Sequence, residues 1–329
     1  MRRDLSERIF SIEHRQSFDT TALEIFRYQS ENNPVYMNFL NGLGNRHKEV
    51  HSPEEIPFLP VEFFRTQRVI TGNLPSRIVF ESSGTTGSQP GRHYVVSPEL
   101  YENSFLKTFR LFYGEPADFL IAAILPSYTE RNNSSLVYMV NTLIRLSRNP
   151  GSGFYIHKTG ELNASIRGGL SEQKKVLLFG VSFALMDLAE NYSPDLQGVI
   201  VMETGGMKGR RKEITRGELH EILKTRFNVP AIHSEYGMTE LLSQAYSSGE
   251  GIFYTPPWMK VLIRDPQDPL SVIEKSGVTG GINIIDLANI HSCSFIATGD
   301  LGRIRDDGSF EVLGRFDDSE IRGCNLLVG

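Results

Sequence analysis

Apolar runs of strand length alternate with helix-type segments along most of this chain. Helix starts are indicated by Ser97-Pro98-Glu99, with a capping serine followed by proline and an acid, and by the capping box Thr215-Arg216-Gly217-Glu218. Strands are expected at 119–125, 176–179, 198–202, 281–285 and 310–313. This alternation predicts a layered α/β fold.

Both ends of the chain depart from that alternation. The first 60 residues have a helical pattern, in which Asp19-Thr20-Thr21 is expected to cap a helix that begins at Ala22. Late in the chain, prolines within 256–257 and 266–269 interrupt the pattern and predict shorter β-elements. The acidic pair Asp306-Asp307 before Gly308 is typical of a hairpin turn.

Composition and charge narrow the class of protein. With 40% hydrophobic and 22% charged residues, the chain has the composition of an ordinary globular protein. Its net charge of −5 gives no electrostatic footprint for nucleic acid or an anionic membrane, and no apolar run approaches the ~20 residues of a membrane helix. Residues 1–8 lead into no apolar signal core, and two cysteines provide no disulfide framework. We therefore expect a cytoplasmic protein with neither a nucleic-acid nor a membrane partner.

A loop rich in hydroxyl groups and glycine follows the apolar run at 77–80. It begins Ser82-Ser83-Gly84-Thr85-Thr86-Gly87 and ends Ser88-Gln89-Pro90-Gly91. Glycines let successive backbone N–H groups converge on one anion, and the hydroxyls add neutral donors. The lysine of a Walker A loop is absent at the required spacing. Taken alone, the segment is better explained as a flexible turn, whereas the motifs that follow it favour a polyphosphate-binding loop.

Four further clusters follow this loop in order. They are Thr204-Gly205-Gly206-Met207, His233-Ser234-Glu235-Tyr236-Gly237-Met238-Thr239-Glu240, Ala297-Thr298-Gly299-Asp300 and Gly314-Arg315-Phe316-Asp317-Asp318. Each follows an apolar segment, and the third is expected to place its carboxylate on a turn. Taken singly, Glu240 is explained as an acid at a helix N-terminus and Tyr236 as a core aromatic. His233 is expected to be structural.

The order of these motifs resembles that of the adenylate-forming superfamily, which includes acyl-CoA synthetases, luciferases and nonribosomal adenylation domains. The family's phosphate loop is similar to 82–87, and its Tyr-Gly-x-Thr-Glu, Thr-Gly-Asp and Gly-Arg-x-Asp-Asp motifs are matched at 236–240, 298–300 and 314–318. Within the superfamily, segments 56–64 and 125–131 most resemble the acyl-protein synthetase of bacterial bioluminescence. The resemblance runs from about Pro57 to the C-terminus.

The resemblance implies a fold and a reaction. The fold is the α/β N-terminal core of an adenylate-forming enzyme, with layered sheets and helices but without the full mobile C-terminal domain. Residues 1–313 would form the adenylating core, including the helical segment at about 1–60, and 314–329 a hinge remnant with a short tail. With ATP and Mg²⁺, the enzyme would convert a small-molecule carboxylic acid, an acyl or fatty acid, into an acyl-adenylate. Positioning and charge neutralisation carry most of such a reaction.

The resemblance also implies roles on the phosphate side of the site. The loop at 82–87 would hold the β- and γ-phosphates. Glu240 would bind Mg²⁺, which prefers carboxylate and phosphate oxygens. Thr239 would donate a hydrogen bond to the α-phosphate.

On the nucleoside side, the resemblance places adenine between Tyr236-Gly237 and the flat backbone of Gly205-Gly206. Asp300 would accept hydrogen bonds from both ribose hydroxyls. Arg315 would reach the ribose or a phosphate.

The chain departs from the family pattern in two places. The lysine that normally ends the phosphate loop is missing, and Arg92 stands near its place. Eleven residues follow Asp318, where most members continue into a mobile domain that carries a lysine. Bioluminescence acyl-protein synthetases also stop early, and a truncated chain is the alternative.

Two cysteines are candidates for thiol chemistry. Cys324 resembles the acyl-accepting cysteine near the C-terminus of acyl-protein synthetases, and Arg322 would lower its pKa. A small buried hydrophobe is the equally weighted alternative. Cys293, on an expected strand, is expected to be structural. The acyl group would pass to a protein thiol, on Cys324 or a partner protein. The alternatives are CoA as the acceptor, and a weakly active or inactive nucleotide-binding protein.

Overall fold

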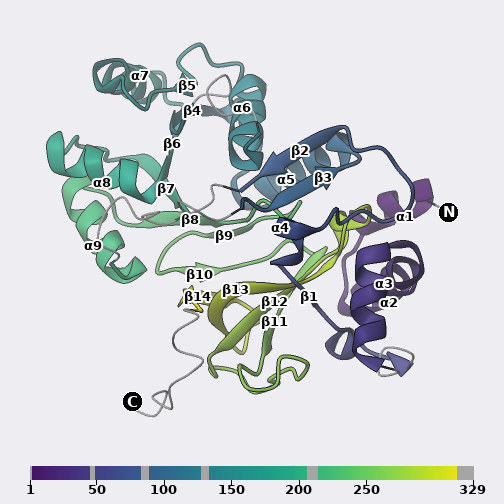
Figure 1. The fold of residues 1–329 in the computed structure, drawn as a ribbon. Helices are drawn as coiled ribbons and strands as arrows, with labels where there is room; N and C mark the ends of the chain where they lie inside the picture. Colours follow the sequence, from purple (N-terminus) through teal and green to yellow (C-terminus); the bar gives the residue numbers. More distant parts are fainter. Residues whose placement is uncertain (1, 45–48, 83–88, 127–132, 206–213, 317–329) are drawn as a thin grey trace.

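The computed structural model describes residues 2–44, 49–82, 89–126, 133–205 and 214–316. Two larger sheets and a hairpin form its framework (Figure 1). The first sheet has the order β5-β4-β6-β7-β8-β9, in which β5 to β8 are parallel and β9 is antiparallel to β8. Its strands are β4 (Phe119–Ile124), β5 (Gly153–Phe154), β6 (Lys175–Val181), β7 (Val199–Thr204), β8 (Ile232–Tyr236) and β9 (Ala245–Ser247).

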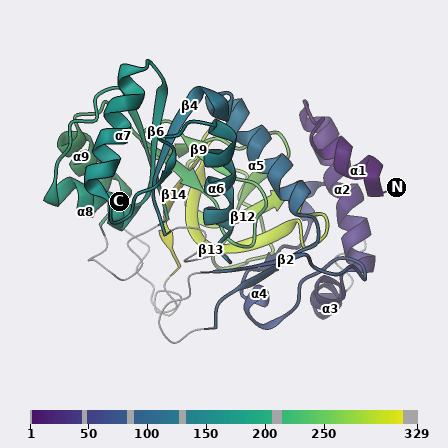
Figure 2. The same ribbon diagram turned by 90° about the horizontal axis from the view of Figure 1, so that it is seen from above.

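Helices cover both faces of this sheet (Figures 1 and 2). Phe109 of α5 packs on Phe119 of β4 from one side, while Arg216 of α9 reaches Glu203 of β7 from the other. Every residue of β4 is buried, as expected for a central parallel strand. The helices between the strands are α5 (Pro98–Tyr113), α6 (Ser135–Ser147), α7 (Thr159–Ser171), α8 (Ser182–Asn191) and α9 (Arg216–Phe227).

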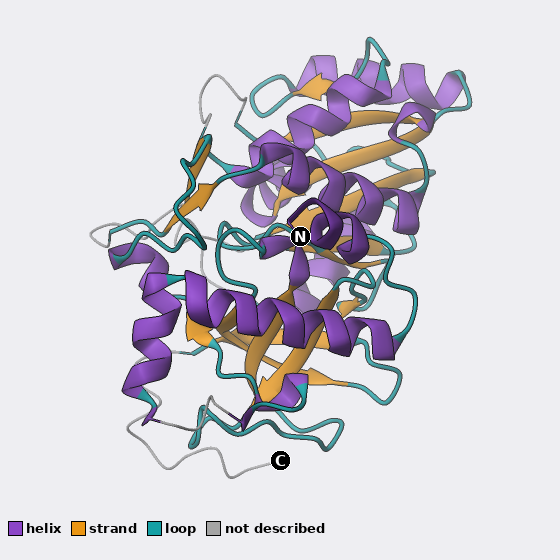
Figure 3. Ribbon diagram, turned by 90° about the vertical axis from the view of Figure 1, so that its right-hand side faces the viewer, coloured by secondary structure: helices purple, strands orange, loops and turns teal. Residues whose placement is uncertain are grey.

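The second sheet has the order β10-β14-β13-β12-β11, and β1 pairs in parallel with β13. Its strands are β1 (Leu59–Pro60), β10 (Ile252–Phe253), β11 (Met259–Arg264), β12 (Gly280–Asp286), β13 (Phe295–Ile304) and β14 (Phe310–Arg315). The N-terminal helices α1 (Arg2–Ile9), α2 (Arg15–Asn32) and α3 (Pro34–Gly42) lie beside this sheet (Figure 3). Gln29 of α2 fastens them, because its side chain donates to the carbonyls of Asn289 and Ile290.

A separate two-stranded hairpin lies in the chain between the N-terminal helices and the first large sheet. It consists of β2 (Ile78–Glu81) and β3 (Arg92–Val95), preceded by the short helix α4 (Phe63–Thr66). His93 of β3 packs edge-on against Phe64 of α4, with 5.8 Å between ring centroids. Because β2 ends at Glu81 and β3 begins at Arg92, the hairpin holds both ends of the predicted phosphate loop.

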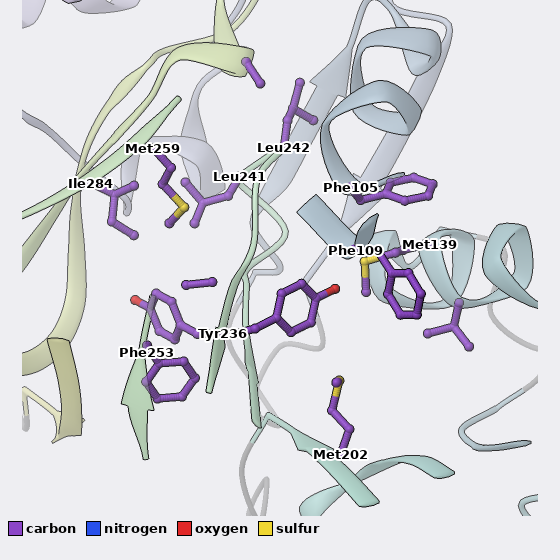
Figure 4. Close-up of a cluster of buried hydrophobic side chains, with 14 of the residues drawn as sticks. Phe105, Phe109, Met139, Met202, Tyr236, Leu241, Leu242, Phe253, Met259 and Ile284 are labelled. Atoms are coloured by element: carbon purple, nitrogen blue, oxygen red, sulfur yellow. The ribbon is translucent and has the colours of Figure 1, made fainter. Parts of the chain in front are cut away.

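The two sheets share one apolar core. Figure 4 shows Tyr236 of the first sheet beside Phe253 of the second, with Met259 and Ile284 of the second sheet on the same side. The rings of Tyr236 and Phe253 are 5.9 Å apart in an edge-to-face arrangement. Within the described residues, no helix is both long and apolar enough to cross a bilayer.

Most of the predicted elements are confirmed. All five expected strands are present as β4, β6, β7, β12 and β14. Ser97 caps α5 by accepting from the Leu100 amide, and Thr215 and Glu218 form the expected capping box of α9. The turn at 306–308 connects β13 to β14, with Gly308 at a φ of +83°.

The predicted cap at Asp19-Thr20-Thr21 is wrong. These residues lie inside α2, which begins at Arg15 and has His14 as its N-cap. The hydroxyls of Thr20 and Thr21 donate back to the carbonyls of Gln16 and Ser17. Such back-bonding satisfies a threonine hydroxyl within a helix, so the residue type alone does not locate a cap.

Candidate functional site

Two of the motifs meet where the first sheet faces the second. Tyr236 ends β8, and its hydroxyl donates to Asp300 Oδ2 of β13 at 2.8 Å. The Tyr236 side chain is buried, and burial together with the charge of Asp300 holds its pKa well above the usual value. The ring therefore presents a neutral phenol whose proton points to the carboxylate.

Asp300 lies within β13 rather than on the expected turn. It is the cross-strand neighbour of Arg315 on β14, whose Nε is 3.5 Å from Asp300 Oδ1. Each carboxylate oxygen thus faces a donor from a different element. The Arg315 side chain is 69% exposed, so solvent and solutes reach its guanidinium.

A third motif residue, Glu240, lies at the base of the predicted phosphate loop. Ser82 and Gly91 close this base, since the Ser82 amide donates to the Gly91 carbonyl at 2.9 Å and the Gly91 amide donates to Ser82 Oγ at 2.8 Å. A Cβ atom added to Gly91 would clash with Glu240 Oε1 and would lie 3.4 Å from Ser82 Oγ. Glycine at 91 therefore makes the space in which the Glu240 carboxylate and the loop base lie side by side.

The Glu240 carboxylate is buried at the base of the loop. Burial raises its pKa to about 7, an effect that Asp300 increases and that Arg65 and Arg315 oppose. No side chain of the described residues forms a salt bridge with it. A buried carboxylate in this condition is suited to a divalent cation, which prefers oxygen ligands. The Glu240 carboxylate therefore fits Mg²⁺, which proteins usually hold through one or two carboxylates together with substrate phosphates.

Three buried side chains hold the backbone around Glu240. His93 Nδ1 lies 2.8 Å from the Thr239 carbonyl, and Asn289 donates to the Glu240 carbonyl at 2.7 Å. Burial lowers the pKa of His93 to about 4, so the ring is neutral and carries its proton on Nδ1, because a carbonyl only accepts. Asp286 then accepts from the amides of Leu242 and Ser243 at 2.7 and 2.9 Å.

The expected adenine-side backbone lies at the end of β7. Gly205 follows this strand with a φ of +68°, a conformation that glycine adopts at little cost. Ser182 at the start of α8 donates to the Gly205 carbonyl at 3.0 Å and to Glu203 at 3.0 Å. The turn is therefore anchored from the face of the sheet that α8 and α9 cover.

Two buried glutamates lie on neighbouring strands and point to opposite faces of the first sheet. Although burial opposes it, hydrogen bonding to His220 and the charge of Arg216 lower the pKa of Glu203. Within the described part of the chain, no cation pairs with Glu235. Burial, with the nearby charge of Glu203, raises the pKa of Glu235 to about 7, while Thr204 donates a hydrogen bond to it.

The structure groups the expected site residues as follows. Tyr236, Asp300 and Arg315 form one contact group, and Ser82 with Glu240 forms another. Gly205, Gly237 and Thr239 lie at the strand ends beside them. Ser83, Gly84, Thr85, Thr86, Gly87, Gly206 and Cys324 lie outside the described residues.

Arg92, His233 and Cys293 were also singled out from the sequence, and each is held by contacts within the fold. Arg92 Nε donates to Glu81 at 3.0 Å, so this atom is engaged within the hairpin. His233 is 3.1 Å from the Tyr113 hydroxyl and packs within the fold. Cys293 lies just before β13 rather than on it, and burial raises the pKa of its thiol to about 12. Arg65 and His93 carry no sequence signal for this site, because neither belongs to a motif and only the fold brings them to Glu240.

No protein-family model and no curated protein matches this chain. Solved structures do match its fold. ATP-bound MatB from Rhodopseudomonas palustris superposes with a TM-score of 0.54 at 16% identity, over 72% of this chain and 47% of MatB. O-succinylbenzoate coenzyme A synthetase (MenE) from Bacillus subtilis, in complex with AMP, gives 0.51 at 19% identity, over 74% and 62%. The amide bond synthetase McbA from Marinactinospora thermotolerans gives 0.50 at 17% identity, over 77% and 51%.

The chain thus spans about half the length of MatB and McbA. At these identities the likeness concerns the fold. It confirms the expected α/β architecture, and the chain has the fold of the adenylate-forming enzyme core.

The two buried glutamates predict opposite effects of pH on stability. A carboxyl pKa raised on folding gives stability that is present below the unfolded pKa and is lost as pH rises through the folded pKa. Glutamine does not ionise, so the Glu235→Gln variant does not lose this stability as pH rises. Its free energy of unfolding should therefore rise, relative to that of wild type, by on the order of 2 kcal/mol from pH 5 to pH 8. Urea denaturation at several pH values measures the difference.

Glu203→Gln is the matched control. It removes the charge that Arg216 and His220 face, so it should destabilise the protein at pH 8. A Glu235→Gln stability difference that stays flat from pH 5 to pH 8 would contradict the assignment.

Proposed function

We propose that this chain binds ATP with Mg²⁺ and activates a carboxylic acid as its acyl-adenylate. The observation that carries the proposal is the Tyr236–Asp300 hydrogen bond, which joins two motif residues at the same sheet junction where Glu240 meets the loop base. MatB with bound ATP and MenE in complex with AMP share this fold and support the choice of ligand.

The adenosine part would lie across Tyr236 and the Gly205 turn. The Asp300 carboxylate accepts hydrogen bonds, and ribose supplies two hydroxyl donors. Arg315, whose guanidinium is mostly exposed, would then contact the ribose or a phosphate. In this arrangement the Tyr236 proton stays on the phenol, because burial and Asp300 disfavour its loss.

The phosphates would lie towards Ser82 and Glu240. A bound magnesium ion would neutralise phosphate charge, and Glu240 is the residue that would hold it. His93 and Asn289 fix the backbone of Thr239 and Glu240, so that the Thr239 hydroxyl is presented from a rigid segment. This rigidity matters because a preorganised donor needs no reorganisation during the reaction.

The reaction follows from these positions. A carboxylate oxygen of the acid bonds to the α-phosphorus while the bond from that phosphorus to pyrophosphate breaks. The finer proposal is that the acid is an acyl or fatty acid, and that the acyl group passes to a protein thiol in the manner of an acyl-protein synthetase. Under this proposal residues 1–313 form the catalytic core and 314–329 the hinge remnant and tail, and the protein works in the cytoplasm.

A second candidate has CoA as the acyl acceptor. MenE, which shares the fold, is an O-succinylbenzoate coenzyme A synthetase. Pyrophosphate release from ATP with a panel of acids tests the adenylation proposal, and the appearance of an acyl-CoA only when CoA is present distinguishes the two acceptors. Nucleotide binding without pyrophosphate release would instead indicate a binding protein.

Glu240→Gln should lower Mg²⁺-dependent pyrophosphate release. Loss of one charge-assisted contact costs on the order of 1.5–3 kcal/mol, and the amide keeps the side-chain volume. A steady-state pyrophosphate assay measures the effect, with Glu24→Gln on α2 as the control for loss of a carboxylate far from the site. Equal rates in wild type and Glu240→Gln would refute the metal role.

Asp300→Ala should weaken ATP and AMP to a similar extent, because both nucleotides carry the ribose. Isothermal titration calorimetry gives both dissociation constants, and Asp307→Ala in the β13–β14 turn serves as the control. An ATP defect that spares AMP would exclude the ribose assignment.

Cys324→Ser should abolish self-acylation while leaving pyrophosphate release intact. In the proposed step the thiolate attacks the acyl carbon, the sulfur–carbon bond forms, and AMP leaves with the electron pair of the broken bond. Intact-mass spectrometry after incubation with ATP, Mg²⁺ and an acid should show a hydroxylamine-labile shift of one acyl group. If Cys293→Ser removes the label and Cys324→Ser keeps it, the assigned cysteine is wrong.

A further inference from the structure

The strand that presents Asp300 leaves its regular pairing with β12 at residues 298–300. On β12, Gly281 pairs with Leu301 and Asn283 pairs with Ala297 of β13. One residue of β12 lies between these pairs, whereas three residues of β13, 298–300, lie opposite it. Thr298-Gly299-Asp300 therefore forms a bulge, and such bulges redirect a side chain at the cost of regular backbone hydrogen bonds.

The guanidinium of Arg264 lies at this break. From the end of β11 it donates through Nη1 to the Ile282 carbonyl at 2.7 Å and through Nη2 to the Thr298 carbonyl at 2.6 Å. Nη1 also donates to Asn283 Oδ1 at 3.0 Å. One planar group thus bonds both strands where they separate, and the fixed fork of an arginine suits this role better than a single ammonium group.

The bulge is tied to Asp300 through Thr298. The Thr298 hydroxyl donates to the Ile282 carbonyl at 2.9 Å and accepts from the Asp300 amide at 3.1 Å. Arg264 therefore holds the backbone carbonyl of Thr298, and the Thr298 hydroxyl in turn holds the Asp300 amide. Arg264 forms no hydrogen bond with the Asp300 carboxylate. Besides the direct attraction between the two charges, it acts on Asp300 through these neighbours.

Arg264 also reaches the residue that follows β14. The Phe316 amide donates to the Gly299 carbonyl at 2.9 Å, inside the bulge. The Phe316 ring lies over the guanidinium, with 5.2 Å from Cζ to the ring centroid, which is cation–π distance. The group thus contacts the bulge on one side and the end of the β14 segment on the other.

Gly281 on β12 leaves the space that the Arg264 guanidinium occupies. A Cβ atom on Gly281 would lie 2.5 Å from Arg264 Cζ and 2.7 Å from Nε. Any other residue at 281 would displace the guanidinium, so glycine on β12 makes its place.

We propose that Arg264 is a positioning residue, which holds the Thr298–Asp300 bulge in the geometry that presents Asp300 to the ribose and fastens Phe316 to it. The ribose contact rests on the proposed function, whereas the bracing of the bulge rests on the contacts alone. If Arg264 only stabilised the second sheet, replacing it would lower the stability of the protein without changing its preference for the ribose hydroxyls.

The test compares Arg264→Gln and Arg264→Lys with Arg303→Gln. Arg303 lies on β13, the strand that carries the bulge, but outside the bulge, and it pairs with Glu311 of β14. Arg303→Gln therefore controls for the loss of an arginine that stabilises this sheet without contacting the bulge. Affinities for ATP, 2′-deoxy-ATP and 3′-deoxy-ATP give the preference for ribose hydroxyls. We expect Arg264→Gln to reduce this preference at least tenfold, Arg264→Lys to restore little of it, and Arg303→Gln to keep it.

Asp300→Asn completes the comparison. If Arg264 acts through Asp300, the double variant Arg264→Gln/Asp300→Asn should have no less ribose preference than Asp300→Asn alone. Loss of preference in Asp300→Asn together with full preference in both Arg264 variants overturns the inference. A wild-type protein that binds no ATP, or that binds it without ribose preference, contradicts the proposed function instead.

Hydrogen exchange tests the bracing without any nucleotide. Peptides that cover Ala297 to Phe316 contain the Asp300 and Phe316 amides, and both are hydrogen-bonded in the bulge. Arg264→Gln should speed their exchange at least tenfold relative to wild type and to Arg303→Gln. Equal exchange in all three proteins overturns the positioning role whatever the nucleotide measurements show.

Discussion

The hydrogen bond from Tyr236 to Asp300 connects the two sheets at the candidate site. Tyr236 is fixed by the end of β8 and by ring contacts with Phe253 and Phe310, at centroid distances of 5.9 and 5.6 Å. Asp300 is fixed by the bulge in β13. Since neither residue can move far without disturbing a core, their separation is set by how the sheets pack. The chemistry proposed for the site therefore depends on the docking of the first sheet against the second.

Burial of carboxylates is the main energetic cost of this arrangement. Glu203 faces two basic side chains, which lower its pKa despite burial. Asp286 accepts three backbone amide bonds, which offset only part of the rise that burial causes in its pKa. Glu240 lacks a comparable partner among the described residues, and its pKa is raised by burial. A bound cation would supply that partner, so ligand binding would relieve a cost that the folded protein carries. Functional sites commonly retain such local instability.

The sequence predicted the strands and two helix caps because these depend on local patterns. It also predicted which motif residues to examine, and Tyr236 and Asp300 do meet. It could not predict that Asp300 would sit in a strand bulge, since the break in register arises from pairing with β12. Nor could it identify Arg264 or His93, whose contacts reach residues 34 and 146 positions away in the chain. Long-range contacts of this kind carry no local signal.

A crystal structure of the protein with AMP tests the central claim most directly. We predict density for adenosine against Tyr236, with both ribose hydroxyls within hydrogen-bonding distance of the Asp300 carboxylate and the phosphate directed towards Glu240 and the base of the loop at Ser82 and Gly91. Nucleotide bound elsewhere on the molecule, or an empty site at a saturating AMP concentration, would contradict the account.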